Sequence, residues 1–193
     1  MSLTDATAAI DDGGLVVYPT DTVYGLAGDA LDADAVERVF AAKGRDRSKP
    51  LSMGVGSVDA ALDHVHASER EEAFMREFLP GAVTVVCEKR GSVPDALTGG
   101  KPKVGVRVPD HDLALDFLAT AGPVTATSAN RSGRSNARRT SDLDPEIRDA
   151  VGVVLDGGET PGGESTVVDA GAGVIHRRGR DADRIEAWLE ERP

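Results

Sequence analysis

The stretch LVVYPTDTVYGLAGDALDADAVERVFAAKG (residues 15–44) contains two predicted elements and the polar segment that joins them. Its apolar opening, LVVY, predicts a β-strand. In DADAVERVFAAKG (32–44), apolar residues recur at helical spacing, Asp32 or Asp34 can cap the start, and Gly44 suits the end. A strand followed by a helix is the repeating unit of an α/β fold.

Strand-like and helix-like stretches alternate along the rest of the chain. Further apolar strand signals lie at 51–55, 82–87, 104–108, 123–127, 151–155, 165–170 and 173–176. Further helix signals lie at 68–81, 110–122, 142–151 and 181–192. The alternation predicts an α/β fold, and the two adjacent late strands indicate an antiparallel part, so we expect a mixed sheet flanked by helices. We expect a single domain over residues 1–193.

The composition narrows the class of protein. The chain is 40% hydrophobic and 28% charged, which fits one domain with its own core. No run approaches the roughly 18 apolar residues that cross a bilayer, and the N-terminus has no leader-like pattern, so we expect a cytoplasmic protein without a membrane segment. The one cysteine, Cys87, lies in an apolar run and is expected to be buried.

The positive charges are concentrated in two short segments. The net charge is −11, yet KGRDRSK (43–49) and RSGRSNARR (131–139) each contain four bases. Lys43 alone is explained as a cation at a helix C-terminus, with its stem along the apolar stripe. Closely spaced Arg45, Arg47 and Lys49 have no such local explanation and favour a polyphosphate ligand.

Hydroxyl side chains follow three predicted strands, in YPTDT (18–22), TATSAN (125–130) and GEST (163–166). Each can be a simple turn in which a short polar side chain bonds the backbone. Together they indicate a ligand site, because ligands of open α/β sheets lie beyond strand ends. We expect Gly25, which closes the first segment, to allow a tight backbone turn.

Several common site patterns are absent from the sequence. Neither GxxxxGK[ST] nor GxGxxG occurs. The histidines at 64, 66, 111 and 176 lack metal-ligand spacing, so no metal site is predicted. Aromatic residues are 4% of the chain, which offers little for stacking single-stranded bases.

Six motifs in order resemble the YrdC/Sua5 family: YPTDTVYGL (18–26), Lys43-x-Arg45 with Lys49-Pro-Leu, PGAVTVV (80–86), VGVRVPDH (104–111), TSANRSG (127–133) and STVVD (165–169). The matching segments run from about residue 14 to 179. The resemblance implies a twisted sheet with a large concave cavity. It also implies synthesis of L-threonylcarbamoyladenylate from L-threonine, bicarbonate or CO₂, and ATP, with release of pyrophosphate, for N6-threonylcarbamoyladenosine at position 37 of tRNA. The chain resembles the single-domain form, without a separate Sua5 C-terminal domain.

The resemblance also implies roles for individual residues. Lys43 and Arg45 would act as electrostatic catalysts. The ATP contacts would be Lys43, Arg45, Lys49, Lys103, Ala126, Ser128, Asn130, Asn136 and Arg177. The threonine pocket would be formed by Thr22, Tyr24, Arg107, Thr125 and Ser165, with Thr20 nearby. Mg²⁺ would arrive with ATP, and the product would pass to a Kae1-type tRNA transferase complex, with tRNA itself bound weakly if at all.

Four positions depart from the family pattern. Lys49 stands where asparagine is frequent, Lys103 where threonine is usual, Gly54 where some members have histidine, and Asn136 where a Ser-Pro turn is common. Three alternatives also stay open: a carbamoyltransferase domain of the hydrogenase-maturation type, an RNA- or tRNA-binding module that uses the two basic segments, and a relative that binds nucleotide without turnover.

Overall fold

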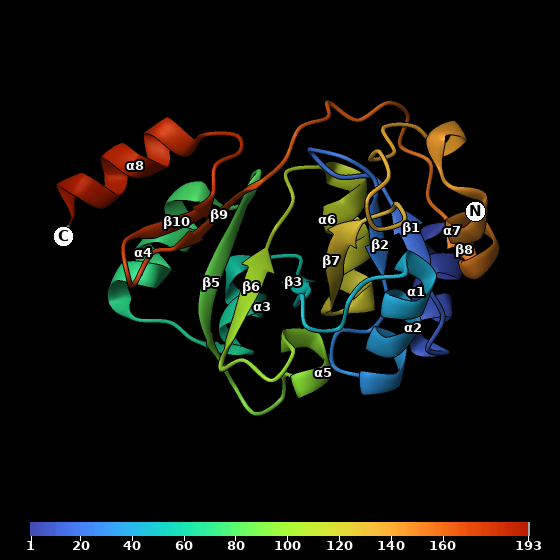
Figure 1. Ribbon diagram of the computed structural model, residues 1–193, viewed down its shortest axis with the longest axis horizontal. Coiled ribbons are helices and arrows are strands. Elements are labelled where there is room, and N and C mark those ends of the chain that lie inside the picture. Colours follow the sequence, from blue (N-terminus) through green and yellow to red (C-terminus); the bar gives the residue numbers. More distant parts are fainter. Residues whose placement is uncertain (193) are drawn as a thin grey trace.

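A computed structural model describes residues 1–192, so the last residue of the expected domain lies outside the described part. Its ten strands form one mixed sheet in the order β10-β9-β5-β6-β3-β7-β2-β1-β8, with β4 paired to β5 outside this path (Figure 1). The strands are β1 (Val16–Tyr18), β2 (Gly25–Ala27), β3 (Ser52–Gly54), β4 (Val65–His66), β5 (Val83–Lys89), β6 (Lys103–Arg107), β7 (Val124–Ser128), β8 (Val153–Val154), β9 (Thr166–Asp169) and β10 (Val174–Arg177). Because β1–β8, β3–β6 and β5–β9 pair in parallel while β9–β10 and the other pairs are antiparallel, the predicted mixed α/β fold is confirmed.

Helices connect most of these strands. They are α1 (Leu3–Asp11), α2 (Ala33–Lys43), α3 (Val58–Leu62), α4 (Glu69–Phe78), α5 (Asp95–Thr98), α6 (Asp112–Ala121), α7 (Pro145–Ala150) and α8 (Ala182–Glu191), with a 3₁₀ turn η1 (Thr140–Asp142). The caps of α2 are as predicted: Asp32 Oδ1 accepts from the backbone N–H of Asp34 at 2.9 Å, and Gly44 has the left-handed φ of 58°.

The sequence-based prediction missed the strands β2 and β4 and the helices α1, α3 and α5. β2 and β4 have three and two residues, too few for an alternating pattern to show. α1 was also missed, although its start carries a readable capping box. There the Ser2 side chain accepts from the backbone of Asp5, and the Asp5 carboxylate accepts from the backbone of Ser2.

The two faces of the sheet are covered differently. On one face α2, α4, α7 and α8 build the larger core, in which Phe40, Phe74, Ile147 and Ile185 are at most 1% exposed. On the other face, α1 and α6 pack against β1, β7 and β8 in a smaller core. The rest of that second face, over β3, β5, β6 and β9, carries the residues that line a cavity.

Candidate active site

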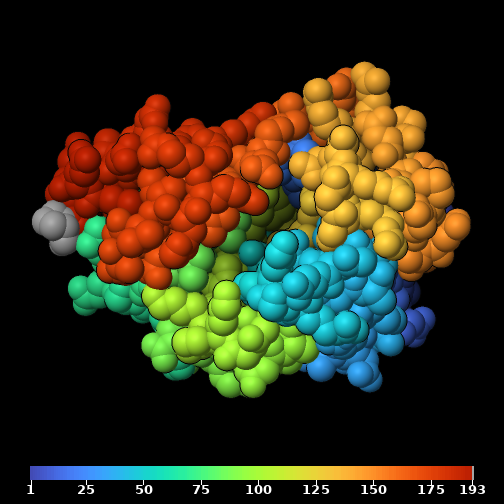
Figure 2. Space-filling view, viewed as in Figure 1, coloured from blue at the N-terminus to red at the C-terminus, as the bar shows by residue number. Residues whose placement is uncertain are grey.

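The cavity has a volume of about 770 Å³, the size of a small-molecule site. Figure 2 shows the surface hollowed between the C-terminal segment in red, the segment after β7 in yellow and the segment after α2 in light blue. Its floor carries little side-chain bulk. A Cβ on Gly105 of β6 would lie 2.7 Å from Ser52 Oγ, and Ala126 of β7 also lines the hollow. The large concave cavity implied by the sequence is therefore present.

Positive charge prevails in the cavity. Its lining contains five cationic side chains and two carboxylates, namely Arg45, Lys101, Lys103, Arg107 and Arg177 against Glu164 and Asp169. The whole chain has a net charge of −11, so the lining differs in sign from the protein around it. A hollow of this kind concentrates anionic ligands.

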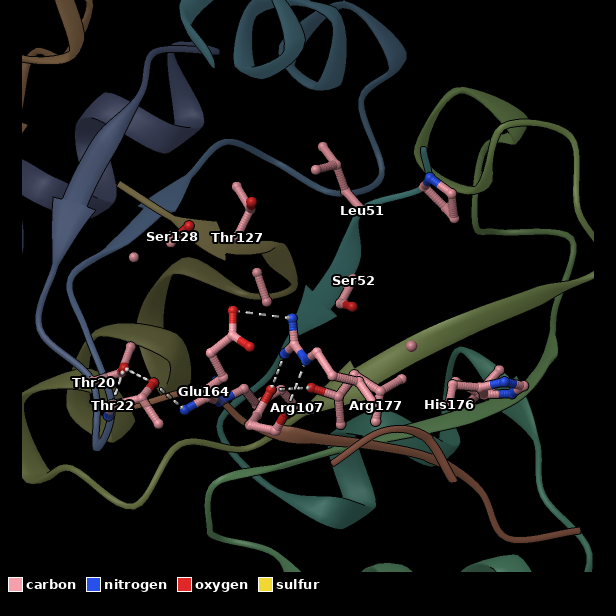
Figure 3. Close-up of a pocket in the computed structure, with 18 of the residues that line it drawn as sticks. Thr20, Thr22, Leu51, Ser52, Arg107, Thr127, Ser128, Glu164, His176 and Arg177 are labelled. Atoms are coloured by element: carbon pink, nitrogen blue, oxygen red, sulfur yellow. Dashed lines mark hydrogen bonds and ion pairs between the residues drawn. The ribbon is translucent and has the colours of Figure 1, made fainter. Parts of the chain in front are cut away.

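Hydroxyl groups and one arginine gather where β1 turns toward β2 (Figure 3). Thr20 Oγ1 lies 3.1 Å from Thr22 Oγ1. Arg107 Nη2 donates to Thr22 Oγ1 at 2.8 Å and to Asp21 Oδ1 at 2.6 Å. Arg107 Nε is buried and has no hydrogen-bond partner within residues 1–192, a costly state that a bound acceptor would relieve.

Two further arginines of the cavity, Arg45 and Arg177, come from distant segments of the chain. Arg45 follows α2, and its guanidinium donates to the backbone oxygens of Lys49 and Pro50 at 3.0 Å each. Arg177 ends β10 and donates from Nη2 to Ser165 Oγ at 2.9 Å. Arg45 and Arg177 both line the cavity, and burial, with a further contribution from the charge of Arg177, lowers the pKa of Arg45. Two guanidinium groups held together in this way suit a phosphate chain.

Lys43 lies behind the cavity wall rather than in it. The side chain is 2% exposed and is not among the lining residues. Its ammonium group donates to the backbone oxygens of Ser128 and of Asn130, the latter at 2.7 Å. Burial, with a smaller contribution from Arg45, lowers its pKa to about 8. Lys43 thus lies outside the cavity lining and fixes the loop after β7, and its direct contact with a nucleotide stays a prediction.

Asn130 has a similar internal role. It is 7% exposed and does not line the cavity. Its Nδ2 donates to the backbone oxygens of Arg131 at 2.8 Å and Arg134 at 2.9 Å. Ser128, Ala126 and Asn136, by contrast, do line the cavity, as expected for the loop that Lys43 and Asn130 hold.

Thr125, predicted to bind threonine, does not line the cavity. Its side chain is fully buried on the face of β7 opposite Ala126. Its hydroxyl donates to the backbone oxygen of Leu26 and accepts from the N–H of Gly28. Thr125 thus joins β7 to β2 and does not reach the cavity.

Of the other residues predicted for the site, three line the cavity and one does not. Ser165 lines the cavity, as does Tyr24, whose hydroxyl donates to the backbone oxygen of Gly158 at 2.8 Å. Lys103 lines it and pairs with Asp169. Lys49 is exposed and is not a lining residue.

The sequence reading also missed lining residues inside the strands. Tyr18, Ser52 and Thr84 face the cavity from β1, β3 and β5, and His176 faces it from β10. A polar residue at an alternate position of an otherwise apolar strand, as at Thr84 in AVTVV, was the available signal. Gly25 was also misread: it has no left-handed φ, but a Cβ there would lie 2.8 Å from Tyr18 Cε1, so the glycine makes room for that ring.

Acidic neighbours pair with four of the eight bases in the two basic segments. Arg47 pairs with Glu37, Arg134 with Asp144, and both Arg138 and Arg139 with Glu159. The segments do meet, since Arg131 lies against Gly44, and half of their bases are paired with carboxylates. This arrangement weakens the alternative of an RNA-binding face.

Two features are absent from the described residues. No cluster of three or more histidine, cysteine or acidic residues within 1–192 is placed to hold a metal ion. Nor does that part of the chain contain a helix with the length and apolar character that a bilayer crossing requires.

Comparisons with known proteins agree with the motifs and the fold. The model of the Sua5/YciO/YrdC family, whose description reads "Telomere recombination", matches residues 8–179. A threonylcarbamoyl-AMP synthase of Pyrococcus abyssi is 40% identical over 168 residues, which cover 85% of this chain and 49% of that protein. A putative threonylcarbamoyl-AMP synthase of Mycobacterium tuberculosis is 37% identical, and the match covers 86% of this chain and 78% of that protein.

A solved structure, that of P. abyssi Sua5 complexed with L-threonine, superposes with a TM-score of 0.84 at 33% identity, over 95% of this chain and 56% of the other. This chain therefore spans about half the length of its Pyrococcus relatives. The family match over most of the chain, together with these identities, establishes that the chain belongs to the Sua5/YciO/YrdC family.

Proposed function

We propose that this protein is a threonylcarbamoyl-AMP synthase, which joins L-threonine, bicarbonate or CO₂, and ATP and releases pyrophosphate. The observation that carries the proposal is the cavity itself, in which an unpartnered Arg107 Nε and the Arg45–Arg177 pair line one hollow. The first suits a carboxylate and the second a polyphosphate. The names of the relatives, one of them solved with L-threonine bound, support the same assignment.

In this proposal the amino acid binds beside β1 and β2. Arg107 holds the α-carboxylate, because its Nε has no partner within residues 1–192 and a guanidinium N–H bonds well to a carboxylate oxygen. Asp21 and Thr22 accept from Nη2 of the same guanidinium, at 2.6 and 2.8 Å. The arginine is thus oriented before the substrate arrives, which is what precise positioning requires.

The reaction then needs positioning and charge rather than a protein nucleophile. The threonine amine attacks CO₂ to form a carbamate with loss of a proton, and a carbamate oxygen attacks the α-phosphorus of ATP as pyrophosphate leaves. Negative charge accumulates on the phosphate oxygens during that step. Arg45 and Arg177 stabilise this charge, while Lys43 contributes by holding the Ser128–Asn130 loop against the nucleotide.

In this proposal Mg²⁺ enters the site bound to ATP. Since no metal-ligating cluster occurs within residues 1–192, and Asp169 is already paired with Lys103, we assign Mg²⁺ to the phosphates of ATP and give it no protein ligands. A cytoplasmic location and delivery of the product to a Kae1-type tRNA transferase belong to the same proposal.

The test is pyrophosphate release with each substrate omitted in turn. We expect release to need ATP, L-threonine and bicarbonate together. Release that is independent of L-threonine, or that needs carbamoyl phosphate in place of threonine and bicarbonate, would reject the proposal in favour of a carbamoyltransferase. Nucleotide binding without release would indicate a relative without turnover.

A tRNA titration addresses the RNA-binding alternative. A steep salt dependence of binding, unaffected by ATP and L-threonine, would favour that module, because counterion release dominates such complexes. We expect weak binding, because acidic partners pair with four of the six arginines in the two basic segments.

A further inference from the structure

Tyr18 lies across the floor of the cavity. It is the last residue of β1 and is paired with Gly25 of β2. Its ring packs against Phe117 of α6 with the centroids 5.4 Å apart, and the side chain is 2% exposed. The same side chain lines the cavity, so Tyr18 stands at the boundary between the smaller core and the ligand space.

Two glycines let the Tyr18 hydroxyl reach the middle of the sheet. A Cβ on Gly25 would lie 2.8 Å from Cε1 and 3.3 Å from the hydroxyl oxygen. A Cβ on Gly54 of β3 would lie 3.4 Å from the same oxygen. Since β7 and β2 separate β3 from β1, the ring extends over both of these strands and places its hydroxyl beside β3.

This hydroxyl is available to a ligand as a donor. Within residues 1–192 no protein group hydrogen-bonds to it. Burial raises the pKa of Tyr18 to about 12, so the phenol keeps its proton at physiological pH. Gly54, which lies beside this hydroxyl, is paired with Arg107 of β6, so the hydroxyl is near the arginine assigned to the substrate carboxylate.

We propose that Tyr18 Oη donates a hydrogen bond to the amino-acid carboxylate that Arg107 holds, and that Tyr18 is thus a specificity-determining residue. The inference rests on the proposed function. Two neighbouring donors, a guanidinium and a protonated phenol, converge on an anionic oxygen rather than on an amine, because an amine or ammonium group would meet only donors. The phenol therefore selects a free amino-acid carboxylate and helps set the depth at which the substrate lies.

The test is Tyr18→Phe, which removes the hydroxyl and leaves the ring against Phe117. We expect the KM for L-threonine to rise about 10- to 100-fold, the usual effect of losing a hydrogen bond to a charged group, while the KM for ATP and the Tm stay unchanged. The matched control is Thr7→Val, which removes a hydroxyl that bonds Thr120 on the surface, far from the cavity lining. It should leave both KM values unchanged.

A second variant tests the same hydroxyl without changing Tyr18, in case Tyr18→Phe does not fold. Gly54→Ala places a methyl group 3.4 Å from the hydroxyl, an ordinary contact distance, where it competes with the substrate for access to Tyr18 Oη. It should also raise the KM for L-threonine selectively. A KM for L-threonine within twofold of wild type in folded Tyr18→Phe overturns the inference alone. Wild-type protein that forms no threonylcarbamoyl-AMP overturns the proposed function and this inference with it.

Discussion

Lys43 and Arg45 are two residues apart, yet they lie on opposite sides of the cavity wall. Lys43 ends α2 and is 2% exposed, and its ammonium group donates to the backbone oxygens of Ser128 and Asn130. Arg45 lines the cavity and shares its space with Arg177. Lys43 thus organises a loop of the protein, whereas Arg45 faces the cavity.

The short basic motif Lys43-x-Arg45 therefore combines two separate roles, anchoring a loop and lining the cavity. A buried ammonium needs several acceptors to offset the loss of water, and the loop after β7 supplies them. A guanidinium at a cavity wall keeps part of its donor set for a ligand. Substitutions at the two positions should therefore differ in whether they affect stability or only turnover.

The largest effect should follow Arg45→Ala. Because Arg45 stabilises charge that develops on phosphate oxygens, its loss should lower kcat for threonine-dependent pyrophosphate release about 10²–10³-fold. The Tm should change little. Arg47→Ala is the matched control, since Arg47 is exposed, pairs with Glu37 and is not a lining residue of the cavity. Equal kcat values for Arg45→Ala and Arg47→Ala would show that Arg45 has no catalytic role.

Lys43→Met should act on stability first. It leaves buried carbonyl oxygens of the loop without their donor, so unfolding by denaturant should become easier by about 1–3 kcal/mol. Activity should fall as well, because the loop loses its anchor. If Lys43→Met melts like wild type but loses turnover as Arg45→Ala does, the separation of the two roles is incorrect.

Arg107→Lys extends the comparison to the amino-acid side of the cavity. A lysine keeps the charge but loses the planar fork, so the KM for L-threonine should rise about tenfold while the KM for ATP is retained. Steady-state kinetics with each substrate varied in turn provide the measurement. An increase confined to the KM for ATP would assign Arg107 to the nucleotide instead.

The smallest effect is a pH dependence of stability specific to Lys43. Its pKa is lowered from the ordinary value of 10.5 to about 8 in the folded state. Between these two pH values the unfolded chain binds more protons than the folded one, so stability rises with pH through this window. The difference in unfolding free energy between wild type and Lys43→Met should therefore widen from pH 8 to 10.5. A constant difference would contradict the charged, buried lysine.

The sequence predicted much of the fold because its apolar runs are long enough to show their period. All eight predicted strands and all five predicted helices occur in the structure, with shifted ends. β2 escaped detection because Gly25–Ala27 is short and follows a polar segment. The register that joins β2 to β7 comes from tertiary pairing, which no local pattern reports.

The site was predicted less completely, because which residues line the cavity depends on strand geometry. Alternation along β7 places Ala126 and Ser128 on the cavity face and Thr125 on the other, which the family resemblance alone does not reveal. The position of Lys43 near the apolar stripe of α2 agreed with burial, but its acceptors at Ser128 and Asn130 are distant in sequence. Tyr18 was overlooked because its role depends on glycines in two other strands.

The central claim is that this cavity joins threonine, bicarbonate and ATP in one product. Mass spectrometry of a reaction with ¹³C-bicarbonate tests it most directly. We predict a ¹³C-labelled threonylcarbamoyl-AMP that forms only when L-threonine and MgATP are both present and that is strongly reduced with Arg45→Ala. ATP consumption that yields AMP or ADP without any labelled adduct would contradict the account.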